Sequence, residues 1–224
     1  MNNNNCPQLK YKLEYLKEQV LIMGEHIANI DTGKNFAEIE DLSQELLDIV
    51  LEFKRHVSLE KFLIKEQIQT KELLIGGTLD KNKLESEIIG PAESTRIGVV
   101  RSINCILSDT PKKIRIAFID YKTLGVDYLS NLNEVNKKAM DIGFDLCQTE
   151  TALYLGREDL HLAEGERFAV AMEPIAYGSQ KYVFCLTNRR YSSLGGYRQT
   201  LAVLPSQDWE QKYIFVIPDI ENEK

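Results

Sequence analysis

The feature that most constrains the fold is a heptad repeat of apolar residues in the first 53 residues. Two runs of apolar positions step alternately by three and four residues, the spacing that keeps one stripe of a helix facing a partner helix. A turn-rich pentapeptide, DTGKN, separates the two runs. The pattern predicts an antiparallel, coiled-coil-like helical hairpin within residues 1–75. The seam residues are Leu9, Leu13, Leu16, Val20, Met23, Ile27 and Ile30 in the first run, and Ile39, Leu42, Leu46, Ile49 and Phe53 in the second.

The seam becomes polar after Phe53, because His56 and Glu60 occupy the next two seam positions. Ser58 is a residue type that can cap a new helix. We therefore expect a kink or break near His56–Ser58, followed by helix to about Leu74. The pair Gly76–Gly77 is expected to end it.

A polar segment rich in Gly, Pro and Ser, residues 76–95, is expected to be a linker. From residue 96 the apolar period becomes strand-like, and the turn SDTPKK lies between two β-rich runs. This pattern predicts a hairpin over residues 96–121. It opens a predicted α+β domain, 96–219.

A helix over residues 131–143 is predicted next, capped by Asn131 or Asn133 and ended by Gly143. After it, short apolar runs separated by polar turns predict a β meander over 151–217 and an antiparallel rather than a βαβ arrangement. The expected strands are 152–155, 167–172, 181–186, 201–204 and 213–217. The fold class is therefore α+β, a helical hairpin followed by a mainly antiparallel sheet with one short helix.

Segments "IGFDLC", "RFAVAMEPI" and "YIFVI", with Trp209 before the last, resemble a small domain of uncharacterised bacterial proteins. That domain has a helix ending in a Leu-Gly-Leu-x-Leu-Cys-Pro type segment, an IAMEPI-type strand and a closing W…FVFV strand. The resemblance covers about residues 135–218 and implies a module with an antiparallel sheet. It implies no activity and no catalytic residues, and Gln148 replaces the expected proline.

Composition narrows the classes of function. The chain has 27 basic and 34 acidic residues, a net charge of -7, and no strongly basic region, which disfavours non-specific duplex binding. It has no apolar run near the roughly 18 residues of a membrane span, and its N-terminus lacks a basic-then-apolar signal pattern. The four cysteines are far apart, with neither disulfide-framework nor zinc-site spacing. A cytoplasmic protein with free thiols, no cofactor and no membrane partner is expected.

Cys147, with Glu150 and His161 nearby in sequence, is a candidate nucleophile with a base and an orienting acid. No glycine-rich elbow or protease-type signature surrounds it. The alternative interpretation is that Cys147 fills space where a helix meets a strand. We favour this packing interpretation, and the thiol-dependent or hydrolytic enzyme remains an alternative.

Two other residue groups have candidate chemistry. The histidines His26, His56 and His161 lack the close paired spacing of metal ligands, so no metal site is expected. The segment LTNRRYSSLGGYRQT combines guanidinium groups, which bind phosphate or carboxylate, with tyrosines, which stack on bases. Its residues form the candidate anion or nucleic-acid loop: Arg189, Arg190, Tyr191, Tyr197 and Arg198.

The sequence thus favours a non-catalytic interaction or adaptor protein. In this hypothesis the helical hairpin mediates self-association or docks a protein partner, and the β-rich region presents the arginine loop. Nucleic-acid or anion binding through that loop is the second alternative to this hypothesis, beside the enzyme.

Overall fold

The computed structural model divides the chain into two compact units, one formed by Met1–Phe62 with Ile220–Lys224 and one by Leu63–Asp219. The structure describes residues 14, 17–25, 28, 36–77, 108–127, 131–158, 160–190, 197–205 and 212–218. Most of the predicted linker and the predicted strand at 96–107 lie outside these ranges. So do five seam positions: Leu9, Leu13, Leu16, Ile27 and Ile30.

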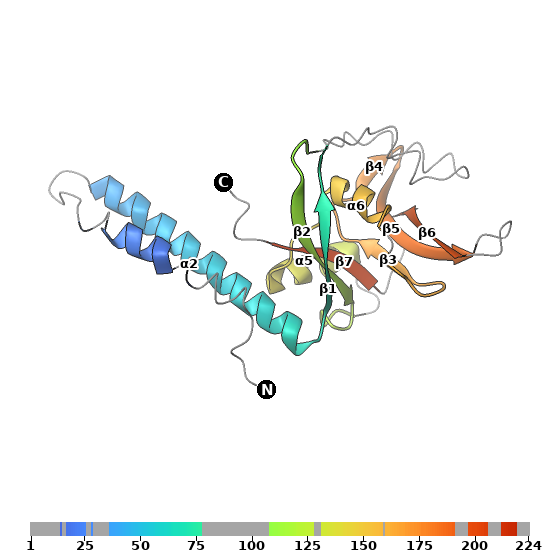
Figure 1. Cartoon of the computed structure of the whole chain (residues 1–224), viewed down its shortest axis with the longest axis horizontal. Coiled ribbons are helices and arrows are strands. Elements are labelled where there is room, and N and C mark those ends of the chain that lie inside the picture. The colour runs from blue at the N-terminus through green and yellow to red at the C-terminus, as the bar shows by residue number, and fades with distance from the viewer. Residues whose placement is uncertain are drawn as a thin grey trace. The chain divides into compact units, whose positions relative to one another are not determined.

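The first unit is helical where it is described. Residues 17–25 are helical, and α2 (Phe36–Lys65) is a 30-residue helix whose last residues belong to the second unit (Figure 1). The sequence of α2 contains no glycine or proline, which are the residues that weaken helix interiors most. At about 1.5 Å per residue this helix is roughly 45 Å long. The pairing of these two segments into a hairpin stays a prediction.

Helix α2 is continuous through His56–Ser58, so the predicted kink or break is wrong. The alternating steps of three and four residues continue past Phe53 through His56 and Glu60 to Leu63, and these last three side chains are buried. The two polar residues therefore occupy the seam without ending it. Ser58, which was expected to cap a new helix, is an exposed residue of the helix interior.

The predicted extension of this helix to Leu74 is also wrong. Helix α2 ends at Lys65, and Gln67 adopts a left-handed backbone with φ of 52°. The N–H of Ile68 bonds to the carbonyl of Leu63 at 3.0 Å, which satisfies a carbonyl at the helix end. Strand β1 (Gln69–Ile75) follows immediately.

The second unit is built on a seven-stranded sheet in the order β1-β2-β7-β3-β5-β4, with β6 paired to the other edge of β5 (Figure 1). The remaining strands are β2 (Lys112–Asp120), β3 (Arg167–Val170), β4 (Ile175–Tyr177), β5 (Gln180–Arg190), β6 (Tyr197–Pro205) and β7 (Lys212–Ile217). The predicted strands from residue 167 onward are thus confirmed in outline. Strand β4 lies in a segment that was interpreted as a turn.

The order of strands corrects the predicted meander. Strand β7 does not lie beside β6, its predecessor in the chain, but between β2 and β3. It runs antiparallel to β2 and parallel to β3, with Ala169 opposite Tyr213 and Val170 opposite Ile214. The other ladders of the described strands are antiparallel.

The predicted hairpin over 96–121 is corrected as well. The partners of β2 are β1 on one side and β7 on the other. Strand β1 precedes the predicted linker, so the antiparallel pair forms across residues 76–111 rather than across SDTPKK. The N–H of Gly77 bonds to the carbonyl of Ser108 at 2.8 Å at the end of this pair.

Helix α5 (Leu132–Ile142) confirms the predicted helix at 131–143 and its caps. The side chain of Asn131 accepts a hydrogen bond from the N–H of Glu134 at 3.1 Å, which satisfies a free donor of the first turn. Gly143 ends the helix with φ of 122°, a conformation that L side chains rarely adopt. Its N–H bonds to the carbonyls of Ala139 and Met140.

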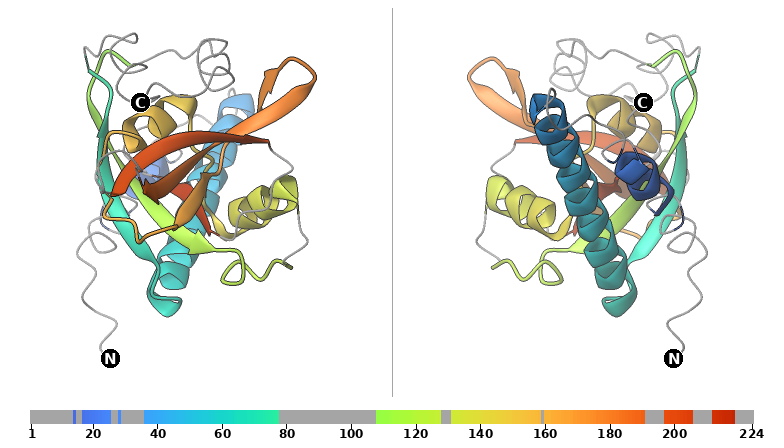
Figure 2. Two further views of the ribbon diagram at one scale, coloured as in Figure 1. Left: turned by 90° about the vertical axis from the view of Figure 1, so that its right-hand side faces the viewer. Right: turned by 90° about the vertical axis from the view of Figure 1, so that its left-hand side faces the viewer.

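The predicted strand at 152–155 is instead part of helix α6 (Thr149–Leu155). All its residues from Glu150 to Leu155 are buried, and a short apolar run buried on every side gives no period that separates strand from helix. Helix α6 contacts β1 and β6, which lie at opposite ends of the sheet order. The sheet curls, and α6 fills the space between its two ends (Figure 2).

Candidate functional site

Cys147 is a packed residue between α5 and α6. Its side chain is 4% exposed, and its Sγ donates to the carbonyl of Ile214 in β7 at 3.3 Å. Its own N–H bonds to the carbonyl of Ala171 at 2.7 Å. Burial raises the pKa of the Cys147 thiol far above its usual range, so the thiolate that a nucleophile requires is not formed near neutral pH.

The two proposed partners of Cys147 lie in different surroundings. Glu150 is buried at the start of α6, and its Oε1 accepts a hydrogen bond from the N–H of Ser108 at 2.8 Å. His161 is exposed in the segment before β3, where its backbone φ is 51°. Glu150 therefore anchors the chain ahead of β2. These surroundings favour the packing interpretation of Cys147 over the catalytic one.

The histidines are similarly dispersed. His56 is 3% exposed on α2, with its Nε2 3.7 Å from the Oε1 of Glu52, one turn away. The side chain of His26 lies outside the described residues. Within the described ranges, no group of three His, Cys, Asp or Glu side chains is placed to hold a metal ion.

The arginine segment was predicted to be a loop, but four of its five candidate residues belong to strands. Arg189 and Arg190 end β5, and Tyr197 and Arg198 begin β6. In the ladder Arg189 lies directly opposite Arg198, and Arg190 lies opposite Tyr197. Tyr191 lies outside the described residues. The fold therefore places two arginines directly opposite each other in the β5–β6 ladder.

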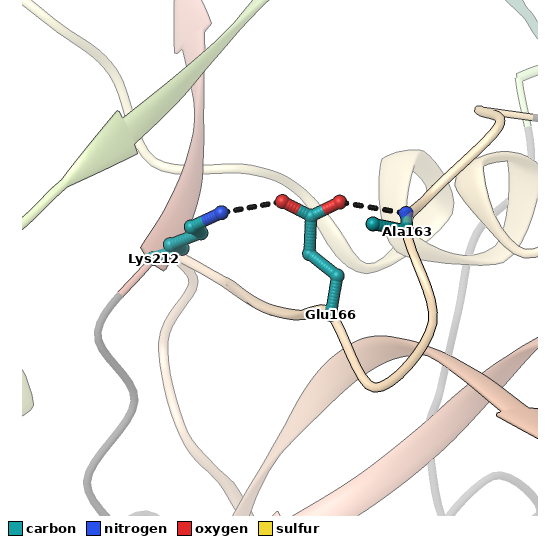
Figure 3. Close-up of polar contacts among 3 residues, drawn as sticks. All are labelled: Ala163, Glu166 and Lys212. Carbon is teal, nitrogen blue, oxygen red and sulfur yellow. Dashed lines mark hydrogen bonds and ion pairs between the residues drawn. The ribbon is translucent and has the colours of Figure 1, made fainter.

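An ion pair that the sequence pattern did not indicate joins the starts of β3 and β7 (Figure 3). The ammonium group of Lys212 donates to Oε1 of Glu166, and the N–H of Ala163 donates to Oε2 at 2.9 Å. Lys212 Nζ also lies 5.2 Å from the ring centroid of Phe168. Lys212 and Glu166 are 46 residues apart in the chain, so no sequence spacing signals their contact.

The surroundings of Glu166 identify this ion pair as a structural clamp. Burial alone raises the pKa of Glu166, but the hydrogen bonds from Lys212 and Ala163 and the ammonium charge outweigh it and lower that pKa. The preceding loop is held to β5, since Asn188 donates through its side chain to the carbonyl of Leu162 at 2.6 Å. The two carboxylate oxygens of Glu166 thus hold the start of β7 and the loop before β3 in place.

The exposed large apolar side chains of the described residues are concentrated on the helices of the first unit. Six of the ten exposed large apolar side chains of the described residues are in this unit. On α2, the side chains of Leu47, Val50 and Leu51 are 43–52% exposed, and their spacing of three and four residues places them on one face. The remaining three are Val20, Leu21 and Ile22.

These exposed residues were only partly anticipated. Val20 belongs to the predicted seam, but Leu21, Leu47 and Leu51 do not. The seam residues Leu42, Leu46, Ile49 and Phe53 of α2 are half-buried. The helix therefore has a second apolar face beside the seam, which a search for one heptad stripe does not detect. None of the described helices has a stretch long and apolar enough to span a membrane.

Comparisons with protein families, with curated proteins and with solved structures found no match to this chain. The resemblance of residues 135–218 to a bacterial domain remains an expectation.

Proposed function

We propose that this protein acts by association rather than by catalysis, and that its helical unit is the surface that binds. Contiguous apolar side chains on the surface of a water-soluble unit are typical of protein–protein contacts. The observation that supports this most is the exposed face of α2 formed by Leu47, Val50 and Leu51. Full burial of one such side chain contributes about 1.5–3 kcal/mol.

Self-association is the form of this proposal that we favour. A heptad pattern supports helix–helix contact, and a second copy of the chain supplies the same pattern without any other component. In this proposal the sheet of the second unit presents a further surface at the end of the β5–β6 hairpin. In this proposal the helices of one copy pack against the helices of a second copy and so join the two chains.

The test is the concentration dependence of mass for the full-length protein, measured by sedimentation equilibrium. We expect reversible association, and the double variant Leu47→Ser/Leu51→Ser should raise the dissociation constant at least about tenfold. Leu74→Ser is the matched control, since Leu74 is 58% exposed on β1 outside the helical unit. A chain that stays monomeric at every concentration, or an equal effect of the control, would overturn the proposal.

Anion binding at the β5–β6 hairpin is a second candidate, because Arg189 lies directly opposite Arg198. Guanidinium groups bind phosphate, so a phosphate or a nucleic-acid backbone is the ligand that this register position would suit. Binding of a single-stranded oligonucleotide should then weaken with salt and be lost in Arg189→Ala/Arg190→Ala. Lys181→Ala is the control, as this exposed lysine lies at the other end of β5. Retained binding in the double variant would contradict the site.

A further inference from the structure

Three neighbouring strands of the sheet come from a part of the chain without acidic residues. Residues 174–207 contain four of the 27 basic residues and none of the 34 acidic residues. Strands β4, β5 and β6 all lie in this segment, and β5 pairs with both of the others. The fold therefore gathers positive charge into adjacent strands of a protein whose net charge is -7. The basic residues of the segment are Lys181, Arg189, Arg190 and Arg198.

Three of these four basic residues lie at one end of the β5–β6 ladder. Strand β3 and the loop before it are bonded to β5 as far as Asn188. Beyond Asn188 the partner of β5 among the described strands is β6, over two further positions. Arg189 lies opposite Arg198 at the first position. Arg190 lies opposite Tyr197 at the second. Since paired residues are about 5 Å apart across a ladder, these four positions share one end of a two-stranded ribbon.

Two acidic residues, Glu164 and Glu166, lie in the loop that borders this end of the ribbon. The N–H of Asn188 bonds to the carbonyl of Glu166 at 3.2 Å. The carboxylate of Glu166 binds the ammonium group of Lys212 and the N–H of Ala163, so its charge is offset within the fold. Glu164 is exposed, and its charge would act against a bound anion. An anionic ligand at this end should therefore bind more tightly when Glu164 is neutralised.

The residue types at the ribbon end select among anionic ligands. Guanidinium groups bind phosphate, and a tyrosine ring stacks on a nucleobase whose face is free. The bases of a duplex are stacked on one another, so they offer no free face to Tyr197. Three arginines are also few for the dense phosphates of a duplex, which the net charge of -7 would repel. A single strand supplies both phosphates and free base faces.

We infer that the end of the β5–β6 ribbon binds single-stranded nucleic acid, with phosphates at Arg189, Arg190 and Arg198 and a base stacked on Tyr197. This inference rests on the anion site proposed for the same hairpin, and it adds the recognition of a base. The neighbouring strands without acidic residues favour the approach of a polyanion.

The salt dependence of binding tests the phosphate contacts. Fluorescence anisotropy with a labelled oligothymidylate of about 12 nucleotides measures the affinity of the full-length protein. Three arginine contacts predict a slope of about -2 for log K against log salt, because each releases about 0.7 of a counterion from a single strand. Arg198→Ala should change this slope to about -1.4. Glu164→Gln should raise the affinity by about twofold at low salt.

Tyr197→Ala tests the base contact. This variant should bind at least about fivefold more weakly with the slope still near -2, because stacking releases no counterion. Tyr197→Phe keeps the aromatic ring and should bind like the natural chain. Tyr177→Ala is the matched control and should have no effect, since Tyr177 is 39% exposed on β4 at the other end of β5.

The possible results separate this inference from the anion site on which it rests. Arg189→Ala/Arg190→Ala can abolish binding while Tyr197→Ala does not change it, or inorganic polyphosphate can compete as well as unlabelled oligothymidylate at equal phosphate concentration. Either result would mean that the ribbon end binds phosphate alone, so the base contact is wrong and the anion site stands. Equal or tighter binding of a duplex of the same length would also overturn the inference. If the natural chain binds no oligonucleotide at low salt, both proposals fail.

Discussion

The carboxylate of Glu166 binds the ammonium group of Lys212 at the point where the parallel strands β3 and β7 begin. Strand β7 lies in the middle of the sheet although it is the last strand in the sequence. Its ladder with β3 is short, with two paired positions. The ion pair and the Lys212–Phe168 contact thus fix the start of a ladder that has few backbone bonds of its own.

Replacing Glu166 by Gln should lower the free energy of unfolding by about 1–2 kcal/mol at pH 7, since it removes a charged acceptor from two hydrogen bonds. Lys212 is 41% exposed, so solvent screens part of its attraction to Glu166 and keeps this loss small. The lowered pKa of Glu166 stabilises the fold at neutral pH, and this contribution is lost as the pH falls below about 4. Urea unfolding at pH 7 and pH 3 should therefore show a difference between the two proteins that narrows in acid. Glu164→Gln, an exposed neighbour, is the control, and an equal effect there would contradict the clamp.

Gly76→Ala should destabilise the fold more than Gly165→Ala. Both glycines have positive φ, 85° and 73°, which costs an L residue about 1–2 kcal/mol. A Cβ on Gly76 would also lie 2.3 Å from the carbonyl oxygen of Thr110, whereas a Cβ on Gly165 meets nothing within 4 Å. Thermal unfolding of both variants measures the difference, which is the contribution of the close approach between β1 and the start of β2. Equal melting temperatures would show that this approach is not tight.

Ser58→Ala and Asn131→Ala should change stability in opposite directions. Ser58 is an exposed interior residue of α2, where alanine is favoured by about 0.5 kcal/mol. Asn131 caps α5 through the N–H of Glu134, so its loss should cost about 1 kcal/mol. Denaturant unfolding of the two variants measures whether each substitution raises or lowers the free energy of unfolding. If Ser58→Ala instead lowered the free energy of unfolding by about 1 kcal/mol, the result would support a helix break at Ser58.

Cys147 should resist iodoacetamide in the folded protein at pH 7–8, because its thiol is buried and its pKa is raised. Its modification should require unfolding, and mass spectrometry of the tryptic peptides after timed labelling measures the rate. Met140→Cys provides a comparison, since residue 140 is 43% exposed on α5 and should react as a free thiol. Labelling of Cys147 at the rate of that introduced cysteine would revive the nucleophile hypothesis.

Local signals in the sequence predicted the elements whose ends depend on contacts between residues close together in the chain. The caps Asn131 and Gly143 bounded α5 correctly, because capping uses atoms only a few residues apart. Helix α2 ended earlier than expected, because the left-handed residue at its end is Gln67 rather than a glycine. The apolar run in α6 was assigned to a strand, since burial on all sides removes the period on which that choice depends.

Features that join distant segments were not predictable in this way. The position of β7 between β2 and β3, and the pairing of β1 with β2, follow from the packing of the whole sheet. The apolar surface of the helices was likewise predictable only in part. The seam was visible as a period, whereas the exposed leucines at 21, 47 and 51 gained meaning only when their exposure was known.

The central place of β7 also has a consequence for the order in which the chain is made. Translation delivers β1, β2 and then β3 to β6 before Lys212–Ile217, so until β7 is made the strands that precede it form two groups with no ladder between them. The facing edges of β2 and β3 present unpaired backbone groups during that interval, and such edges readily pair with other chains. Strand β7 therefore both joins the two groups of strands and covers the facing edges of β2 and β3.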